Sequence, residues 1–280
     1  MRELLSKRAL LPRRLLAAFV VAVWAVTGAP GSVQAQTRVD LELVLAVDVS
    51  YSMDLDEQRL QRDGYIEALR DPEIMRAIQS GQHRRIAITY IEWAGWTTQQ
   101  IVLPWTIIDS RQSAEAVAAK LAEAPISRHR RTSVSGALDY SDRQFGTGGV
   151  IGERRVIDVS GDGPNNSGPP VGPMRDQIVA KGVVINGLPI VLKPGGAGSM
   201  FDIANLDQYY AQCVIGGSGS FMIPIREKAE FASATRQKLL LEISRLEPPP
   251  SITRVQDPPK MDCMVGEQLW RQYFDDRFRE

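Results

Sequence analysis

Hydrophobic residues along the chain gather into short runs that alternate with longer amphipathic stretches. The run from Leu43 to Val47 is apolar at every position, which is typical of a strand that is buried on both faces of a sheet. Strand-like runs recur at residues 85–93, 100–105, 155–160 and 183–192. A turn at Gly95 joins the first two of these into a hairpin, which predicts one antiparallel edge for the sheet.

Between the strands, polar and apolar positions follow the helical period. Residues 54–70 carry apolar side chains among charged ones at this spacing, and Asp71-Pro72 ends the helix. Further helices are predicted at residues 113–124, 133–145, 171–180, 201–211 and 227–246, and a last strand is predicted to begin at Cys213 to Ile215. This alternation predicts one doubly wound α/β domain over residues 41–246, with a mostly parallel central sheet, one antiparallel edge strand and helices on both faces.

The two ends of the chain differ from this pattern. Residues 1–35 begin with basic residues, continue with the apolar stretch Leu15 to Val26 and end with small residues, as a secretory signal peptide does. That stretch is shorter than the roughly 20 residues that span a bilayer. We therefore expect an exported protein, periplasmic or secreted, with no membrane span after cleavage. Prolines mark residues 247–260 as an extended linker, and residues 267–278 are either a helix that packs back on the domain or a frayed tail.

Composition narrows the classes of partner. Without residues 1–35, the chain holds 28 Lys and Arg against 32 Asp and Glu, a net charge of about −4. This balance disfavours nucleic acid as a partner. The two cysteines, Cys213 and Cys263, either form a disulfide bond in an oxidising compartment or remain two free, buried thiols.

Oxygen-bearing side chains follow the buried apolar run directly, at Asp48, Ser50 and Ser52. In an open α/β sheet, ligands bind beyond the carboxyl ends of the strands. At that place these residues can direct one carboxylate and two hydroxyl groups at a single point. Oxygen donors of this kind suit a hard divalent cation, Mg²⁺ before Ca²⁺ or Mn²⁺.

The segment Asp48-Val49-Ser50-Tyr51-Ser52 resembles the Asp-x-Ser-x-Ser opening of the metal ion-dependent adhesion site (MIDAS) of von Willebrand factor type A (VWFA) domains. Two further parts of that site follow in the expected order: a threonine loop with Thr132, ahead of a helix, and an aspartate loop with Asp162. The resemblance covers residues 39–246. Ser160-Gly161-Asp162-Gly163 replaces the commoner Thr-Asp-Gly form, so the chain looks like an uncharacterised bacterial exported branch, a domain of unknown function.

The resemblance implies a division of labour within the site. The hydroxyl groups of Ser50, Ser52 and Thr132 would bind the ion directly, while Asp48 and Asp162 act directly or through bound water. Because few carboxylates then touch the dication, its remaining charge attracts an Asp or Glu side chain of a partner. We therefore expect a non-enzymatic module that binds an unidentified protein through its metal ion.

Each residue also has a simpler interpretation when it is taken alone. Asp48, Ser50 and Thr132 could cap helices, and Asp162 could stabilise its own turn. Asn165 and Asn166 are typical of turn chemistry, although they could shape the rim of the site. Asp158, inside a strand that looks buried, must be paired with another group or be exposed at an edge of the sheet, and it could also support the metal ligands.

Two alternative functions remain open at this point. One is a metal-dependent phosphoester hydrolase, although the sequence has no nucleophile elbow, phosphate-binding loop or dinucleotide fingerprint. The other is a structural domain in which the metal only joins three loops. The basic segment Arg128-His129-Arg130-Arg131, beside the threonine loop, is interpreted as a solvated rim that could attract an acidic partner.

Overall fold

The computed structural model describes residues 36–192, 201–244 and 260–277. Within them, a five-stranded sheet has the order β4-β3-β2-β6-β7. Its strands are β2 (Glu42–Asp48), β3 (Ile86–Trp93), β4 (Gln99–Ile108), β6 (Arg155–Gly161) and β7 (Val184–Pro189). All neighbouring strands are parallel except β3 and β4, which pair antiparallel at one edge. The predicted mostly parallel sheet with one antiparallel edge strand is confirmed.

Strand β2 lies at the centre of the sheet, between β3 and β6. All seven of its residues are buried, which explains why the sequence is apolar at consecutive rather than alternate positions. Successive residues pack on opposite faces: Leu45 belongs to one apolar core and Ala46 to the other. Asp48, the last residue of β2, is therefore buried at the carboxyl-terminal end of the sheet.

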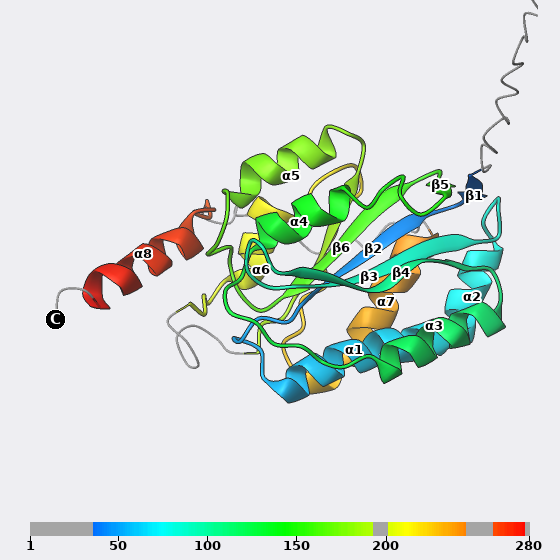
Figure 1. Ribbon diagram of the computed structural model, residues 1–280, viewed down its shortest axis with the longest axis horizontal. Helices are drawn as coiled ribbons and strands as arrows, with labels where there is room; N and C mark the ends of the chain where they lie inside the picture. The colour runs from blue at the N-terminus through cyan, green and yellow to red at the C-terminus, as the bar shows by residue number, and fades with distance from the viewer. Residues whose placement is uncertain (1–35, 193–200, 245–259, 278–280) are drawn as a thin grey trace, which may run out of the picture. The chain divides into compact units, whose positions relative to one another are not determined.

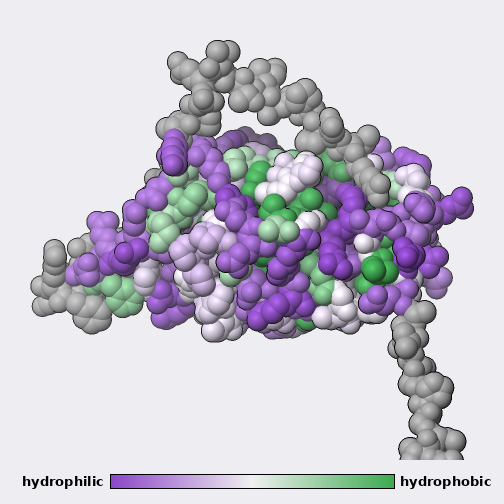
Figure 2. All heavy atoms as spheres, turned by 90° about the horizontal axis from the view of Figure 1, so that it is seen from above, coloured by the Kyte–Doolittle hydropathy of each residue, from purple (hydrophilic) through white to green (hydrophobic). Residues whose placement is uncertain are grey.

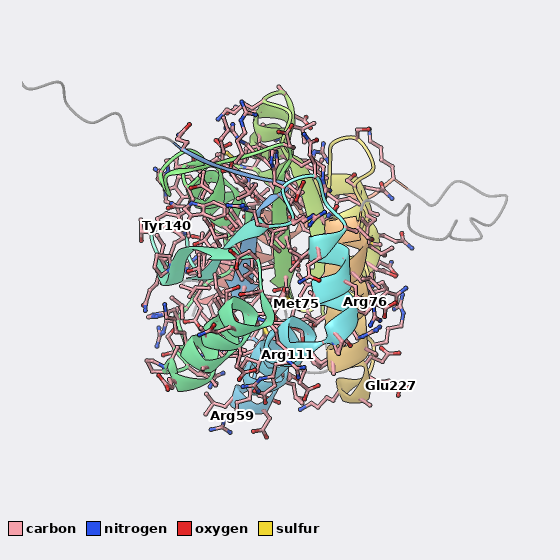
Figure 3. The ribbon with its side chains drawn as sticks, turned by 90° about the vertical axis from the view of Figure 1, so that its right-hand side faces the viewer. Arg59, Met75, Arg76, Arg111, Tyr140 and Glu227 are labelled. Atoms are coloured by element: carbon pink, nitrogen blue, oxygen red, sulfur yellow. A yellow bond between two sulfur atoms is a disulfide. The ribbon has the colours of Figure 1, made fainter. Side chains whose placement is uncertain are left out.

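Helices cover both faces of the sheet (Figure 1). One layer contains α1 (Leu55–Arg70), α2 (Pro72–Gln79), α3 (Arg111–Glu123) and α7 (Phe231–Ser244), and the other contains α4 (Val134–Asp142), α5 (Val171–Val179), α6 (Leu206–Tyr209) and the π-helix η1 (Tyr210–Val214). On α2, Met75 is buried whereas Arg76 is exposed, and Arg111 of α3 also faces solvent (Figure 3). The face seen in Figure 2 is mostly hydrophilic, with small separate groups of apolar residues.

The helix boundaries follow local capping. Asp54 caps α1 through a capping box with Glu57, and Asp71 both ends α1 and accepts a hydrogen bond from the Glu73 N–H at the start of α2. The sequence did not predict α2, nor the short parallel pair β1 (Thr37–Val39) and β5 (Val150–Gly152). The closing helix α7 starts at Phe231, after the 3₁₀ turn η2 (Lys228–Glu230), rather than at residue 227.

The prediction for residues 201–215 is wrong in two respects. Regular helix begins only at Leu206, and no strand starts at Cys213, which lies inside η1. Packing explains the difference, because Tyr210, Cys213 and Val214 are all buried in the core between this segment and the sheet. The residues that follow form isolated bridges along β7: Gly216 with Ile185, Met222 with Gly187, and Ile225 with Ile190 just beyond the strand.

A last helix, α8 (Val265–Arg277), follows the residues that the sequence marked as a linker. Cys213 and Cys263 form a disulfide bond, which attaches the start of this segment to η1. The expected signal peptide and residues 247–259 of the expected linker lie outside the described residues. In the described part of the chain, every helix is too short or too polar to cross a membrane.

Three ionisable side chains are buried together between the sheet and α7: Asp158 of β6, and Lys238 and Glu242 of α7. The Lys238 ammonium lies 2.5 Å from a carboxylate oxygen of each acid. Asn186 donates a hydrogen bond to Glu242, and Tyr65 donates one to Asp158. Asp158 is therefore paired within the core, as a buried carboxylate must be, and one cation faces two acids.

This cluster predicts a pH-dependent stability. Burial raises the pKa of Glu242 to about 7, and the charge of Asp158 adds to the rise. The pKa of a glutamate in the unfolded chain is about 4.3. The stability that comes from holding Glu242 protonated in the fold is therefore fully present below about pH 4.3 and is lost as the pH rises through about 7. Glutamine at this position cannot ionise. We therefore expect the free energy of unfolding of Glu242→Gln, relative to that of wild type, to increase by on the order of 2 kcal/mol when the pH is raised from about 5 to about 8.

Chemical denaturation at both pH values measures this difference. Glu123→Gln, at the exposed end of α3, is the matched control and should follow the wild-type curve. Parallel pH profiles for Glu242→Gln and wild type would contradict the prediction.

Candidate functional site

The first loop of the site begins where β2 ends. The Asp48 carboxylate accepts a hydrogen bond of 2.7 Å from the Ser50 N–H, which holds the turn that leads to α1. The Ser50 and Ser52 hydroxyl oxygens lie 2.8 Å apart, and the Ser52 hydroxyl donates to Asp162 Oδ1 at 2.6 Å. Asp162 follows β6, the neighbour of β2, so the parallel pairing brings the two loops together.

Burial differs across these residues in a way that gives the site one open side. Asp48 and Ser50 are buried, whereas Ser52 and Asp162 are partly exposed. Burial raises the pKa of the Asp48 carboxyl well above its usual range, and the nearby charge of Asp162 adds to the rise. Asp48 at the buried base and Asp162 on the open side are therefore two carboxyl groups whose negative charges repel each other, and a cation between them would relieve this repulsion.

Gly161, directly before Asp162, fits closely against this base. A Cβ at Gly161 would lie 2.8 Å from Asp48 Oδ2 and 3.0 Å from the Tyr210 hydroxyl oxygen. Both of these oxygens are buried and lack a hydrogen-bond partner among the described residues. The indole edge of Trp93, which pairs with Asp48 across β2 and β3, lies on the same side. The glycine that replaces threonine in the aspartate loop therefore leaves room for the Asp48 carboxylate.

This close fit predicts that Gly161→Ala destabilises the protein. The new methyl group would push against two buried polar groups, so we expect the free energy of unfolding to fall by about 1–3 kcal/mol. Gly172→Ala, in α5, is the matched control because its Cβ would meet no atom within 4 Å. An alanine in a helix should leave stability unchanged or raise it by up to about 1 kcal/mol. Equal denaturation midpoints for the two variants would contradict this account of Gly161.

The threonine loop is shaped by an unusual backbone conformation. Arg131 has φ +76°, a left-handed conformation that is rare for a residue with a side chain. This conformation turns the chain sharply at Thr132, after which Ser133 caps α4. The Thr132 N–H donates to Asn166 Oδ1 at 2.9 Å, and the Asn166 N–H donates to the Thr132 carbonyl at 2.8 Å. The threonine and aspartate loops are thus locked together by a reciprocal pair of hydrogen bonds.

Asn165 extends the same connection toward the helices. Its Oδ1 accepts hydrogen bonds from both the backbone and the hydroxyl of Ser135, in the first turn of α4. Its Nδ2 donates to Glu267 of α8 at 2.7 Å. The two asparagines therefore do more than form a turn: they fix the position of Thr132 relative to Asp162 and attach α8 beside them.

The loop ahead of Thr132 is anchored from the other side by a buried ion pair. Arg62 of α1 pairs with Glu92 of β3 and also donates to the carbonyls of Ala124 and Pro125. The Ser127 hydroxyl donates to the second oxygen of Glu92 at 2.6 Å. This pair holds the segment that runs to the candidate site, and its buried charges satisfy each other.

The rim of the site is basic and aromatic. Exposed His129 and Arg130 stand beside the first loop, where Ser50 and His129 form a β-bridge. The Arg128 guanidinium lies over the exposed Tyr51 ring, 5.1 Å from its centre, and the Arg131 guanidinium lies 3.2 Å from the ring centre of Trp270 in α8. The expected basic rim is therefore found next to the candidate ligands.

The five residues that the sequence singled out come from three loops at the same end of the sheet. Hydrogen bonds connect Ser50, Ser52 and Asp162 directly, and Asp48 lies below them. If Gly163, the residue after Asp162, carried a Cβ atom, that atom would lie 3.9 Å from Thr132 Oγ1. The described residues contain no cluster of three or more His, Cys, Asp or Glu side chains suited to a metal.

Sequence reasoning undervalued several residues that shape the site. Asn165 and Asn166 were assigned to turn chemistry, Gly161 was noted only as a departure from the VWFA pattern, and Tyr210 was placed in an ordinary helix. A signal for the asparagines was present, because two adjacent amides directly after a candidate ligand loop can bridge it to another loop. Nothing in the sequence pattern brings Tyr210 toward Asp48.

Comparisons with known proteins agree with this architecture. A protein-family model described as Protein of unknown function (DUF1194) matches residues 38–247. A search of the curated proteins finds no match. Among solved structures, proximal thread matrix protein 1 from the mussel byssus aligns with 12% identity and a TM-score of 0.53, over 75% of this chain and 49% of its own. Another structure of that protein is described as having a zinc occupied MIDAS motif.

Two bacterial structures are also similar. The pilus adhesin SpaC from Lactobacillus rhamnosus GG aligns with 10% identity and a TM-score of 0.54, over 75% of this chain and 32% of its own. A von Willebrand factor type A structure from Catenulispora acidiphila aligns with 15% identity and a TM-score of 0.49, over 73% of this chain and 43% of its own. The matched region thus spans about half or less of these proteins. For proximal thread matrix protein 1 and SpaC, identities this low show a shared fold alone.

Proposed function

The chain belongs to the DUF1194 family of proteins of unknown function. Hydrogen bonds join Ser50 and Ser52 of its first loop to Asp162 of its aspartate loop at one end of the sheet, with the threonine loop beside them. We propose on this basis that it is an exported, non-enzymatic module that binds a partner protein through a divalent cation. The observation that carries the proposal is the chain of contacts from Asp48 through Ser50 and Ser52 to Asp162, beside Thr132.

The donor set fits a hard dication. Ser50, Ser52 and Thr132 offer neutral hydroxyl oxygens, and Asp48 and Asp162 offer carboxylates, directly or through water. Asp48 Oδ2 is a buried carboxylate oxygen without a hydrogen-bond partner in the described residues, which a cation above it would compensate. Mg²⁺ matches these oxygen donors best, with Mn²⁺ and Ca²⁺ as alternatives. When bound, the ion supplies a positive centre that neutral hydroxyl groups leave largely uncompensated.

The surroundings favour an acidic partner. Three arginines and a histidine, residues 128–131, lie along the rim, and the partly exposed Ser52 and Asp162 mark the open side. An Asp or Glu side chain of the partner would therefore meet both the ion and a positive rim. The names of two structural neighbours, a pilus adhesin and a matrix protein with an occupied MIDAS motif, support a binding role at the level of the fold.

Export is part of the same proposal. The basic and apolar pattern of residues 1–35 is that of a signal peptide, and the Cys213–Cys263 disulfide bond suits an oxidising compartment. The protein would then meet its partner in the periplasm or outside the cell.

A pull-down from periplasmic extract, with Mg²⁺ or with a chelator, tests the function. We expect the wild-type chain to capture a defined partner in Mg²⁺, and both the chelator and Asp48→Ala to abolish capture. Asp176→Ala, on the exposed side of α5, is the matched control and should capture normally. Capture that ignores both chelation and Asp48→Ala would contradict the proposal. Phosphoester hydrolysis that is lost in Asp48→Ala would instead establish the hydrolase.

A further inference from the structure

Three buried polar groups lie together beneath the candidate ion site. Asp48 Oδ2, the Tyr210 hydroxyl group and the Trp93 indole N–H have no hydrogen-bond partner among the described residues. The carboxylate oxygen can only accept a hydrogen bond, whereas the hydroxyl group and the indole N–H can donate one. Buried polar groups of folded proteins are nearly always hydrogen-bonded, so an acceptor and two donors left over in one place need a physical explanation.

These groups surround one point beside Gly161. A Cβ atom on Gly161 would lie 2.8 Å from Asp48 Oδ2, 3.0 Å from the Tyr210 hydroxyl oxygen and 3.2 Å from Trp93 Cζ2. Because the first two distances are measured to the same point, the carboxylate and hydroxyl oxygens lie no more than about 5.8 Å apart. A small movement of the side chains, or one bridging water, closes a separation of this size.

The position of the Tyr210 ring is fixed by its surroundings. The ring is fully buried, and a Cβ atom on Gly187 of β7 would lie 2.7 Å from its Cδ1, so glycine in the strand lets the ring lie against the sheet. Tyr210 is also the first residue of the π-helix η1, where the Ile215 N–H donates to the Tyr210 carbonyl at 2.9 Å. Single π-helical turns are frequent at functional sites. The disulfide bond of Cys213 attaches this turn to the segment before α8.

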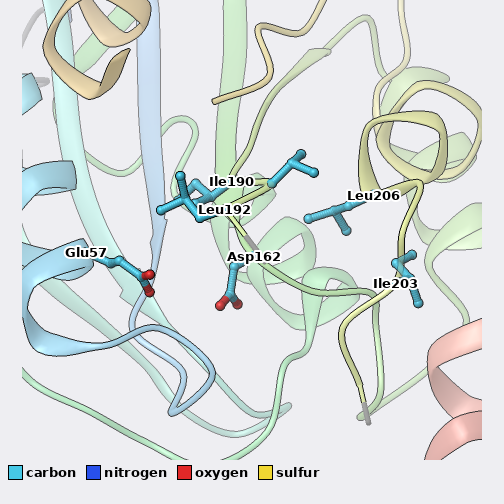
Figure 4. Close-up of a pocket in the computed structure, with 7 residues that line it drawn as sticks. Glu57, Asp162, Ile190, Leu192, Ile203 and Leu206 are labelled. Carbon is cyan, nitrogen blue, oxygen red and sulfur yellow. The ribbon is translucent and has the colours of Figure 1, made fainter. Parts of the chain in front are cut away.

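The segment that carries Tyr210 meets the aspartate loop at two other places. The hydroxyl oxygen of the preceding residue, Tyr209, accepts a hydrogen bond of 3.1 Å from the Asn165 N–H. Leu206, at the start of α6, lines a small pocket together with Asp162 (Figure 4). The segment formed by α6 and η1 therefore lies directly beside the candidate site, where it can act on the ligands.

A donor at Tyr210 would complete the hydrogen bonding of the Asp48 carboxylate. Asp48 Oδ1 accepts the Ser50 N–H, which fixes one of the two oxygens, while Oδ2 points toward the Tyr210 side. A phenol hydroxyl group keeps its proton at neutral pH, so Tyr210 can act as the donor. Groups that hydrogen-bond to a metal ligand fix its orientation, and their loss typically costs about 10–100-fold in metal affinity.

We propose that Tyr210 is a positioning residue of the ion site: its hydroxyl group donates to Asp48 Oδ2, directly or through one water, and holds the carboxylate in the orientation that a small dication requires. The inference rests on the proposed function and adds to it a residue from outside the three loops. Mg²⁺ requires nearly ideal octahedral geometry, whereas Ca²⁺ accepts flexible geometry. Tyr210 should therefore favour Mg²⁺ over Ca²⁺.

Titration calorimetry of the full chain with Mg²⁺ and with Ca²⁺ tests this role in Tyr210→Phe, which keeps the ring and removes only the hydroxyl group. We expect the Mg²⁺ affinity to fall at least about tenfold and the Ca²⁺ affinity to fall less, so that the preference for Mg²⁺ narrows. A residue that only fills the core would change the melting temperature of the cation-free protein and leave both affinities unchanged.

Tyr65→Phe is the matched control. Tyr65 is also fully buried, but its hydroxyl group donates to Asp158 in the cluster between the sheet and α7. This variant should lose stability and keep the wild-type affinities for both ions. An equal loss of Mg²⁺ affinity in the two variants would overturn the inference, because the effect would then be a general weakening of the core.

The remaining outcomes separate the inference from the function on which it rests. If wild type binds Mg²⁺ and Tyr210→Phe binds it equally tightly, the inference is overturned and the proposed function stands. If wild type binds no Mg²⁺, the proposed function fails and the inference fails with it.

A crystal structure of wild type grown in Mg²⁺ gives a second measurement, which does not depend on the folding of any variant. The Tyr210 hydroxyl oxygen should lie within about 3.2 Å of Asp48 Oδ2, or of a water that also contacts Oδ2. A Tyr210 hydroxyl group that is bonded only to other groups would overturn the inference.

Discussion

Asp48→Asn is expected to abolish the response of the protein to divalent cations while leaving the cation-free protein at least as stable as wild type. In wild type, Mg²⁺ at about 100 times its dissociation constant should raise the free energy of unfolding by about 2.7 kcal/mol. For a domain of this size, the melting temperature then rises by about 5–10 °C. The variant should melt at the same temperature with Mg²⁺ and with chelator.

The two halves of this expectation have one physical cause. Asp48 is fully buried, and burial together with the charge of Asp162 raises the pKa of its carboxyl. Without a cation, ionised Asp48 therefore destabilises the fold, because its buried charge is not compensated. The neutral amide of asparagine has no such charge. Asparagine keeps an oxygen that can accept the Ser50 N–H, and its amide nitrogen would stand beside the Tyr210 hydroxyl group. What it lacks is the negative charge that a dication requires.

Thermal melting with Mg²⁺ and with chelator measures both halves. Asp176→Asn is the matched control, since Asp176 is an exposed acid paired with Arg175 on α5. It should keep the full wild-type response to Mg²⁺. A Mg²⁺-dependent rise in the melting temperature of Asp48→Asn, as large as that of wild type, would place any cation site elsewhere.

Of the changes considered for this protein, loss of the Cys213–Cys263 disulfide bond should lower the free energy of unfolding the most. The bond joins residues separated by 50 positions, and closing a loop of that length removes entropy from the unfolded chain worth about 4 kcal/mol. We expect replacement of both cysteines by alanine to lower the melting temperature by about 8–15 °C. Alanine is preferred to serine because Cys213 lies in the apolar core, where a hydroxyl group would lack a partner.

Reduction provides an independent measurement of the same bond. A thiol reductant should lower the melting temperature of wild type to that of the double variant, and should leave the double variant unchanged. Helix α8 would then be held by contacts such as Asn165 with Glu267 and Arg131 with Trp270, so proteases should cut residues 260–277 faster. Equal melting temperatures for oxidised and reduced wild type would contradict the stabilising role.

The sequence predicted the fold well because its strongest signals are those that tertiary packing also obeys. Residues 43–47 are apolar throughout because β2 is buried on both faces, and the turn at Gly95 separates two strands that do pair antiparallel. The segment around Tyr210 was misassigned because its conformation depends on packing against the sheet, which a local pattern does not contain. The same holds for α2, which is only 8 residues long and follows α1 without a loop.

In the candidate site, the sequence likewise suggested the candidate ligands but not the residues that hold their loops in place. Asp48, Ser50 and Ser52 were singled out because they directly follow the buried apolar run, and Thr132 and Asp162 because they match the later parts of the VWFA pattern. The residues that hold the loops in place were not, because their partners are distant in the chain. Asn166 meets Thr132 across 34 positions, and Arg62 meets Glu92 across 30. The left-handed conformation of Arg131 also has no sequence signal, since arginine rarely adopts it.

A crystal structure of the protein grown in Mn²⁺, with anomalous diffraction data, tests the central claim most directly. Mn²⁺ takes oxygen donors like those of Mg²⁺ and can be located by its anomalous signal. The account predicts one strong peak bound to the Ser50 and Ser52 hydroxyl groups and bounded by Thr132 and Asp162, at metal–oxygen distances of about 2.0–2.3 Å. A fully folded chain with no peak among these residues, or with its ion at another place, would contradict it.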